Sequence, residues 1–289
     1  MNDQISNQIA QDILNLAPKI INDLNSEFIK SKFARLTQAV VATGNNGAQD
    51  IVTELDHAIG KMYIEQIYKK YSEYIRIDSE EENERIGTGK IVLRFDPVDG
   101  SKHFATGITE IASAAALSVN DVPFFAMVID PFANHVYHAF KDGGAFLNGT
   151  KISVNQKNIS DDFSFLMYEA PNSKLFQKDN AQFVLQSKQL DLISQSAYRL
   201  RNKGLSSTSI CLVADGSACA YIDFSSSTKL YDVEAAVLIA QEAGAIVTST
   251  RGGEISQIGY ITNSDKKEIT ANLVIANPTA VNDILKILK

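Results

Sequence analysis

Cysteine is scarce in this sequence, and long apolar runs are missing. The two cysteines, Cys211 and Cys219, have no CxxC partner and no neighbouring histidine, which excludes a disulfide framework and a zinc site. We therefore expect two reduced, buried thiols, as in a cytoplasmic protein. No apolar stretch reaches the roughly 20 residues that a membrane-spanning helix needs. The first residues, MNDQISNQIAQDIL, lack the basic and apolar regions of a signal peptide.

Positive charge is also in short supply. Lys and Arg number 27 against 34 Asp and Glu, so the formal net charge is −7. This balance argues against nucleic acid as the main partner. It does not argue against an anionic substrate, because a bound metal ion inverts the local charge. The 289 residues, 45% of them hydrophobic, suffice for one large domain or two closely joined ones.

Hydrophobic periodicity predicts a mixed α/β chain. Helices are expected over 5–30, with a bend at Pro18, and over 56–71. Strands and a hairpin are then expected at 91–95, 111–119, 122–130, 135–140 and 143–149, and this succession suggests an antiparallel sheet. Later, strands at 163–168 and 273–277 alternate with helices at 207–215, at 232–243 and from Pro278 onward. We predict an α+β half, residues 1–158, and an α/β half, residues 159–289, divided at a polar stretch.

The most informative segment is RFDPVDGSKHF, residues 94–104. Its apolar start predicts a strand that ends at Asp96, and Pro97 favours an extended backbone and a stiff turn. Asp99 supplies a second carboxylate three residues after Asp96. Two carboxylates and the Val98 carbonyl suit a hard divalent cation such as Mg²⁺. The amides that follow can bind phosphate oxygens. An ordinary Asx turn is the alternative, because Asp, Pro and Gly are common turn residues.

Three other acidic positions each have an ordinary interpretation beside a functional one. The acidic run over 78–82 is typical of a solvated loop. Asp232 is at the start of a predicted helix, where an acidic residue commonly caps the backbone. Asp50 precedes Thr53, which can itself cap the helix that begins near Asp56.

Taken together, five segments resemble the ordered signature set of the inositol monophosphatase family. They are DIVTELD, SEEEN, DPVDGSKHF, GAFLNG and YDVEAAVLIAQEAGAIV, from Asp50 to Val247. Each segment alone is weak evidence for the family, whereas all five in the same order are a specific match. The resemblance implies a layered αβαβα sandwich of the sugar-phosphatase type. It also implies a Mg²⁺-dependent, lithium-sensitive homodimer that acts on a small phosphorylated metabolite.

The resemblance also assigns roles to individual residues. Its metal ligands are Glu80, Asp96, Asp99, Asp232 and the Val98 carbonyl. Glu80 and Ser101 match the pair that activates the attacking water, and Asp50 and Thr53 match the pair near a third metal. Substrate and phosphate contacts fall on Asp99, Gly100, Ser101, Lys102, Gly204, Ser206 and Asp223, of which Asp223 matches an acid that binds substrate hydroxyls.

Departures from the family pattern concern mainly the substrate. Ser101 replaces the commoner Thr, Tyr231 replaces Trp, and Ala245 replaces Gly. Lys102 resembles the branch of 3′(2′),5′-bisphosphate nucleotidases that act on 3′-phosphoadenosine 5′-phosphate. That substrate stays open beside a polyol phosphate such as inositol monophosphate. A regulatory protein that binds RNA or the transcription machinery is a third alternative, because some bacterial relatives have that role.

Overall fold

Strand β4 (Ile91–Asp99) is buried along its whole length and organises the first part of the chain. In the computed structural model it pairs in parallel with β3 (Ile75–Ser79) and antiparallel with β5 (Ala112–Val119). Strand β6 (Val122–Asp130) then pairs antiparallel with β5. The antiparallel pairing predicted for the strands from 91–95 onward is therefore confirmed for β4, β5 and β6, and β3, which was not among those strands, adds a parallel pair.

The structure describes residues 3–34, 40–43, 49–52, 54–79, 86–226, 228–249 and 272–288. The chain divides into two compact units, residues 1–136 and 137–289. The division into halves at 158/159 stays a prediction of domain organisation.

Two N-terminal helices replace the single bent helix expected over 5–30. Helix α1 (Asp3–Leu14) ends before Asn15, and α2 (Ala17–Ala34) starts anew. Pro18 lies in the first turn of α2, where its missing N–H leaves no hydrogen bond unmade. The apolar residues share one buried side, and they are Ile9, Ile13, Ile20, Leu24 and Phe28.

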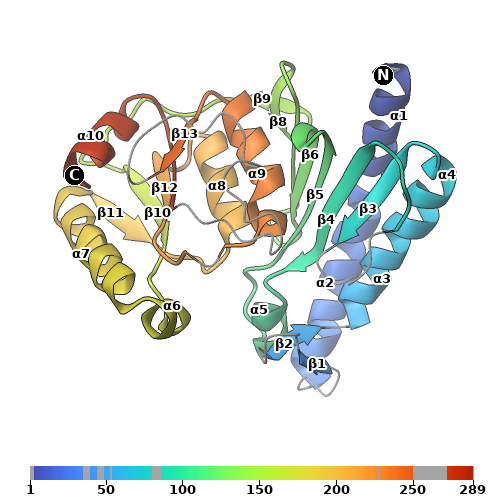
Figure 1. The fold of residues 1–289 in the computed structure, drawn as a ribbon, viewed down its shortest axis with the longest axis horizontal. Coiled ribbons are helices and arrows are strands. Elements are labelled where there is room, and N and C mark those ends of the chain that lie inside the picture. Colours follow the sequence, from blue (N-terminus) through green and yellow to red (C-terminus); the bar gives the residue numbers. More distant parts are fainter. Residues whose placement is uncertain are drawn as a thin grey trace. The chain divides into compact units, whose positions relative to one another are not determined.

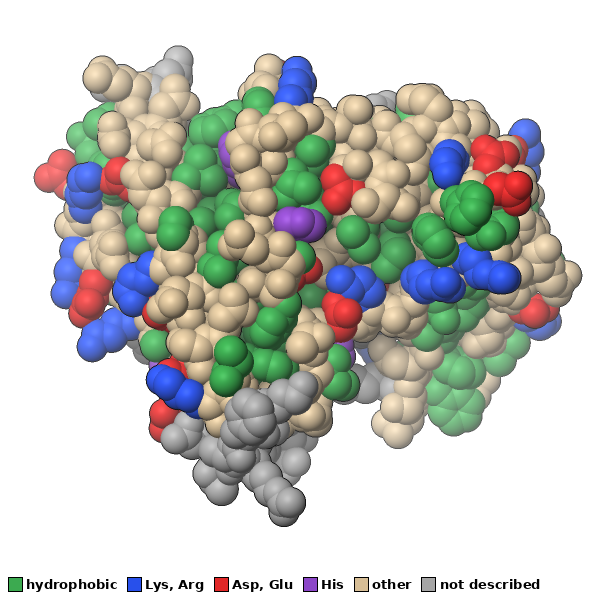
Figure 2. Space-filling model, turned by 180° about the vertical axis from the view of Figure 1, so that it is seen from behind, with side chains coloured by type: hydrophobic (Ala, Val, Ile, Leu, Met, Phe, Trp, Pro, Cys, Tyr) green, Lys and Arg blue, Asp and Glu red, His purple; other side chains and the backbone are tan. Residues whose placement is uncertain are grey.

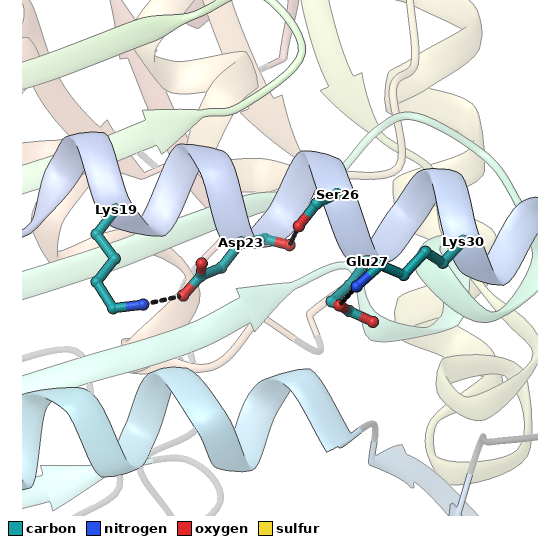
Figure 3. A network of polar contacts seen from close by, with 5 residues as sticks. All are labelled: Lys19, Asp23, Ser26, Glu27 and Lys30. Carbon is teal, nitrogen blue, oxygen red and sulfur yellow. Dashed lines mark hydrogen bonds and ion pairs between the residues drawn. The ribbon is translucent and has the colours of Figure 1, made fainter.

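The outer face of α2 is polar. Lys19 and Asp23 form an ion pair at 2.8 Å, and Lys30 pairs with Glu27 at 2.5 Å (Figure 3). The Ser26 hydroxyl donates to the Asp23 carbonyl at 3.2 Å. Exposed pairs of this kind contribute at most about 1 kcal/mol each, so the buried side of α2 supplies most of its stabilisation.

A second helical stretch covers the β4 strand. Helix α3 (Glu54–Tyr63) continues through the π-helical segment η1 (Ile64–Tyr68) into α4 (Lys69–Tyr71), which confirms the helix expected over 56–71. Tyr63 stacks on Phe95 of β4 with ring centroids 4.5 Å apart. Because side chains alternate along a strand, Arg94 and Asp96 point to the other face of β4. Two shorter strands, β1 (Val40–Thr43) and β2 (Gln49–Val52), pair antiparallel before α3.

The division between the units falls within strand β7 (His135–Phe140), which is the first strand of a meander. Strands β8 (Gly144–Leu147) and β9 (Thr150–Ile152) follow it antiparallel, as the predicted hairpin requires. The Glu242 carboxylate accepts hydrogen bonds from the amides of Asp142 and Gly144 at 2.8 and 2.9 Å. This ties helix α9 (Leu230–Glu242) to the turn between β7 and β8.

A five-stranded mixed sheet forms the rest of the second unit. Its order is β11 (Arg199–Arg201), β10 (Phe165–Glu169), β12 (Ala220–Asp223), β14 (Leu273–Ala276) and β13 (Ile246–Ser249). Strands β10, β11 and β12 are parallel, and β14 is antiparallel to both its neighbours. The predicted α/β character of this part is confirmed.

Helices cover both faces of that sheet. Helices α7 (Asn180–Ser196) and α10 (Ala280–Ile287) lie on one face, and α8 (Ser206–Ala214) and α9 lie on the other (Figure 1). Leu166, Ile222 and Ile284 pack in the core under α7 and α10. Helix α7 and the short α6 (Ser173–Lys178) were not anticipated, because several large apolar residues of α7, such as Leu185 and Leu192, are exposed and give no clean periodicity.

Charges of both signs are interspersed on the face that Figure 2 displays, with hydrophobic side chains between them. The net negative charge is therefore not gathered into one acidic area of that face. Among the described residues, none of the helices combines the length and the apolar content of a membrane crossing.

Candidate active site

A β-bulge in β4 brings two acidic side chains together. Asp96 pairs with Ala114 and Asp99 with Ala112, so three steps along β4 match two along β5. Pro97, which cannot donate a ladder hydrogen bond, lies inside this irregularity, where strands tolerate proline. In a regular strand, residues three apart point to opposite faces. Here a carboxylate oxygen of Asp96 and one of Asp99 lie within 4.8 Å of each other.

The environment of this pair fits a hard cation. Asp96 is 2% exposed and Asp99 is 9% exposed. Two buried carboxylates at such a distance repel each other unless a positive charge lies nearby. Carboxylate oxygens, with no sulfur or imidazole among them, are the donors that Mg²⁺ and Ca²⁺ prefer. The residues present therefore fit a bound divalent cation.

The backbone after the pair turns sharply into helix α5 (Ser101–Thr106). Gly100 has φ 90°, a left-handed conformation that glycine adopts at no steric cost. The amides of Gly100 and Ser101 thus come at the start of α5, and Lys102 is exposed one residue further on. Val98 is buried inside the bulge. The structure thus brings the metal and phosphate residues predicted over 96–102 into one turn.

A buried ion pair lies next to this turn. The Arg94 Nε donates to Asp78 Oδ2 at 3.3 Å, and both side chains are at most 7% exposed. The two residues are register partners in the β3–β4 ladder. The expectation of a solvated loop over 78–82 is therefore wrong for Asp78, which belongs to β3. The charged Arg94 within the apolar run IVLRF is the sequence signal for a buried ion pair. Its partner, Asp78, follows only from the register of β3 and β4.

In the second unit, Asp232 is the third residue of α9. Its Oδ2 accepts a hydrogen bond from the Lys229 amide at 2.9 Å, so Asp232 caps the helix from its third position, and Lys229 is the N-cap residue in place of the Asp232 expected from the sequence. An ionised carboxylate has several acceptor positions, so capping does not exclude metal ligation. The negative charge also interacts favourably with the positive end of the helix dipole.

Asp223, at the end of β12, is fully buried. Its Oδ1 accepts from the Ser225 amide and hydroxyl, and its Oδ2 accepts from the Thr228 hydroxyl, all at 2.7 Å. Burial raises the pKa of the Asp223 carboxyl, and the hydrogen bonds from Ser225 and Thr228 oppose that rise. The contact of Asp223 with substrate hydroxyls stays a prediction. In the structure, the hydrogen bonds of its carboxylate hold Ser225 and Thr228, which follow β12.

Ser206 and Gly204 lie at the start of α8. The buried Tyr221 hydroxyl donates to the Ser206 hydroxyl at 2.8 Å, so strand β12 is linked to this helix end. The pKa of Tyr221 is raised well above its ordinary value, first by burial and then by the charges of Asp223, Glu169 and Asp232. Three carboxylates therefore act on one phenol in the second unit. Gly204, with φ 66°, is exposed in the preceding loop.

The side chains of three predicted site residues are not described by the structure. Glu80 and Thr53 lie outside the described residues. Asp50 belongs to strand β2, and only its backbone is described. Their predicted roles in activating water and near a third metal stay predictions.

The fold and this turn define a mixed α/β protein with paired buried carboxylates at a bulged strand end. The family model "Inositol monophosphatase family" matches residues 12–284. Human inositol monophosphatase 1 is 30% identical over 207 residues, 71% of this chain and 73% of that protein. Nus factor SuhB of Xylella fastidiosa is 26% identical over 229 residues, 79% of this chain and 78% of that protein.

Solved structures agree with this assignment at the level of the fold. The extragenic suppressor protein suhB from Bartonella henselae has a TM-score of 0.78 at 20% identity, covering 96% of this chain and 97% of that one. The chain belongs to the inositol monophosphatase family, and the fold class predicted from the sequence is confirmed.

Proposed function

We propose that the protein is a Mg²⁺-dependent phosphomonoesterase that hydrolyses a small polyol phosphate such as inositol monophosphate. The observation that carries this proposal is the bulged turn. It joins the buried carboxylates of Asp96 and Asp99 to the amides of Gly100 and Ser101 within six residues of chain. A cation site and a phosphate site on one rigid turn match the needs of phosphoryl transfer, which depends on positioning and charge compensation.

Each residue of the turn then has a part in binding. Asp96, Asp99 and the Val98 carbonyl would hold the cation, and the family resemblance adds Asp232 and Glu80 to the set. Bound Mg²⁺ would supply Lewis acidity toward the phosphoryl group and toward water. The amides of Gly100 and Ser101 orient the phosphate oxygens. Glu80 accepts the proton of the attacking water, directly or through the Ser101 hydroxyl.

A second candidate function is regulatory. The relative from Xylella fastidiosa is named a Nus factor, which supports a protein that binds RNA or the transcription machinery. The buried Asp96–Asp99 pair favours catalysis, since two desolvated carboxylates have a cost that a purely binding role does not require. A homodimer in the cytoplasm belongs to the same proposal and rests on the family resemblance.

One experiment separates these candidates. Purified protein is assayed with inositol 1-phosphate, glycerol 2-phosphate, 3′-phosphoadenosine 5′-phosphate and p-nitrophenyl phosphate, with Mg²⁺ and with EDTA. The proposal expects Mg²⁺-dependent turnover with the highest kcat/KM on inositol 1-phosphate. A tenfold preference for the bisphosphate nucleotide would replace the polyol phosphate by that substrate. No turnover of any of the four would leave the regulatory role.

A further inference from the structure

A serine of β5 contacts the backbone of the bulge that carries the acidic pair. Ser113 lies directly opposite the bulge, between the register partners of Asp96 and Asp99. It has no exposed surface, and its hydroxyl donates to the Asp96 carbonyl at 3.4 Å. A bulge interrupts the ladder of backbone hydrogen bonds. Because buried backbone groups need partners, a side-chain donor at this point matters more than it would beside a regular strand.

Ser113 approaches the bulge from the face of the sheet opposite to the Asp96 carboxylate. Phe95 and Ala115 are register partners, and Ser113, two residues before Ala115, shares their face. Asp96 follows Phe95 and points to the other face. The Ser113 hydroxyl therefore bonds to the backbone of Asp96 and does not occupy the carboxylate oxygens that would bind a cation.

Helix α3 packs against the same face as Ser113. Tyr63 stacks on Phe95 there. A Cβ placed on Gly60 would lie 3.9 Å from Pro97 Cγ, inside the bulge. The Tyr63 side chain is fully buried, and its hydroxyl lacks a hydrogen bond of good geometry among the described residues. Burial raises the pKa of Tyr63, and the Ser113 hydroxyl opposes that rise. Ser113 thus lies between the buried side of α3 and the bulge, out of contact with solvent.

We propose that Ser113 is a positioning residue of the cation site, which holds the backbone of Asp96 so that its carboxylate stays within reach of that of Asp99. The inference rests on the proposed phosphatase function and names a residue that sets its affinity for the cation. Removing a group that orients a metal ligand typically weakens metal binding roughly 10- to 100-fold. Because 3.4 Å is long for a hydroxyl donor, the effect of Ser113 belongs to the lower end of that range.

Ser113→Ala tests this directly, because it removes only the hydroxyl from a strand that already has alanine at 112, 114, 115 and 116. Mg²⁺ alone is titrated into the purified chain, and binding is recorded by calorimetry and by the shift in thermal melting. The Mg²⁺ concentration for half-maximal binding should rise roughly tenfold. At saturating Mg²⁺, kcat for p-nitrophenyl phosphate should be largely retained, because the bound ion meets the same ligands.

Two matched variants separate positioning from packing. Ser118→Ala removes a fully buried hydroxyl from the same strand, but the β4 partner of Ser118 is Val92, away from the bulge. Tyr63→Phe removes a buried hydroxyl on the face of Ser113 and keeps the stacked ring. In both variants the Mg²⁺ concentration for half-maximal binding should stay close to that of the unaltered chain, even where the melting temperature without Mg²⁺ falls.

The outcomes distinguish this inference from the function on which it rests. Mg²⁺ binding that is unchanged in Ser113→Ala overturns the positioning role and leaves the cation site in place. Binding that weakens equally in Ser118→Ala or Tyr63→Phe overturns it as well, because the effect then belongs to the packing of buried hydroxyls in general. If the unaltered chain binds no Mg²⁺ and turns over none of the phosphates, the proposed function itself fails, and the role of Ser113 fails with it.

Discussion

Arg94 and Asp78 form a charged link across the parallel β3–β4 ladder, with Nε and Oδ2 3.3 Å apart. Neither side chain has appreciable contact with solvent. Taking two charges out of water costs several kcal/mol per ion, and their attraction roughly offsets that cost. The pair therefore adds little net stability, but it opposes a shift of β3 along the strand that carries Asp96.

Removing only one member of this pair should be severe. Arg94→Met leaves a buried charge on Asp78, and the free energy of unfolding should drop by about 3–5 kcal/mol. The double variant Asp78→Leu/Arg94→Met should recover most of that loss, because the pair is replaced by apolar groups of similar volume. Urea unfolding of the three proteins measures both effects. A loss below about 1 kcal/mol in Arg94→Met would show that water or a neighbouring group compensates Asp78.

Asp99→Asn should nearly abolish phosphatase activity and leave the fold intact. The change keeps the size of the side chain but removes one of the two charges within 4.8 Å at the bulge. Without Mg²⁺ the variant should be at least as stable as the unaltered protein, because the repulsion with Asp96 is relieved. Turnover at saturating Mg²⁺ and thermal melting in EDTA are the two measurements. Near-normal turnover would contradict the assignment of Asp99 to the cation site.

Activity should require Mg²⁺, disappear in EDTA and be inhibited by Li⁺. The metal requirement follows from the oxygen-only donors of the bulge, and the lithium effect rests on the family resemblance. Mg²⁺ should also stabilise the folded chain, by about 2.7 kcal/mol at a concentration of 100 times Kd. Thermal melting with and without Mg²⁺ records this shift, which Asp96→Asn should remove. Full activity in a chelated sample would refute the metal-dependent mechanism.

The sequence predicted the acidic turn over 96–101 more completely than its surroundings, but the predicted strand end at Asp96 is wrong, because β4 continues through a bulge to Asp99. DPVDGS contains its own turn chemistry, so the carboxylates and the glycine follow from local residues alone. The Arg94–Asp78 pair depends on the register of two strands, which no local pattern specifies. The burial of Asp223 depends on Ser225 and Thr228 folding back over it. The sequence therefore predicted that acidic residues such as Asp96 and Asp223 lie at strand ends, but not which side chains they contact.

Stability should decline toward acid pH because of His138. Its ring stacks on Phe146 with centroids 5.2 Å apart, and its Nδ1 is buried with no hydrogen-bond partner among the described residues. Burial lowers the pKa of His138 below its ordinary value of 6.5. As the pH falls through 6.5, the unfolded chain binds a proton that the folded chain does not, so the free energy of unfolding decreases. In His138→Phe this part of the decrease should be absent between pH 7 and 5, as urea unfolding at several pH values would show. An unchanged pH dependence in that variant would assign the decrease to other groups.

Lys102 should influence the choice of substrate without affecting the fold. It is exposed in the first turn of α5, and its carbonyl accepts a hydrogen bond from the Thr106 hydroxyl, which any residue at this position would preserve. Lys102→Ala should therefore change the free energy of unfolding by less than about 0.5 kcal/mol. An ammonium group beside the phosphate turn attracts a second phosphate as a point charge, so kcat/KM for 3′-phosphoadenosine 5′-phosphate should fall several-fold more than for inositol 1-phosphate. Lys102→Arg should retain most of the nucleotide activity, because it keeps the charge. Equal losses on both substrates would mean that Lys102 acts on the phosphate group common to both and does not set the choice of substrate.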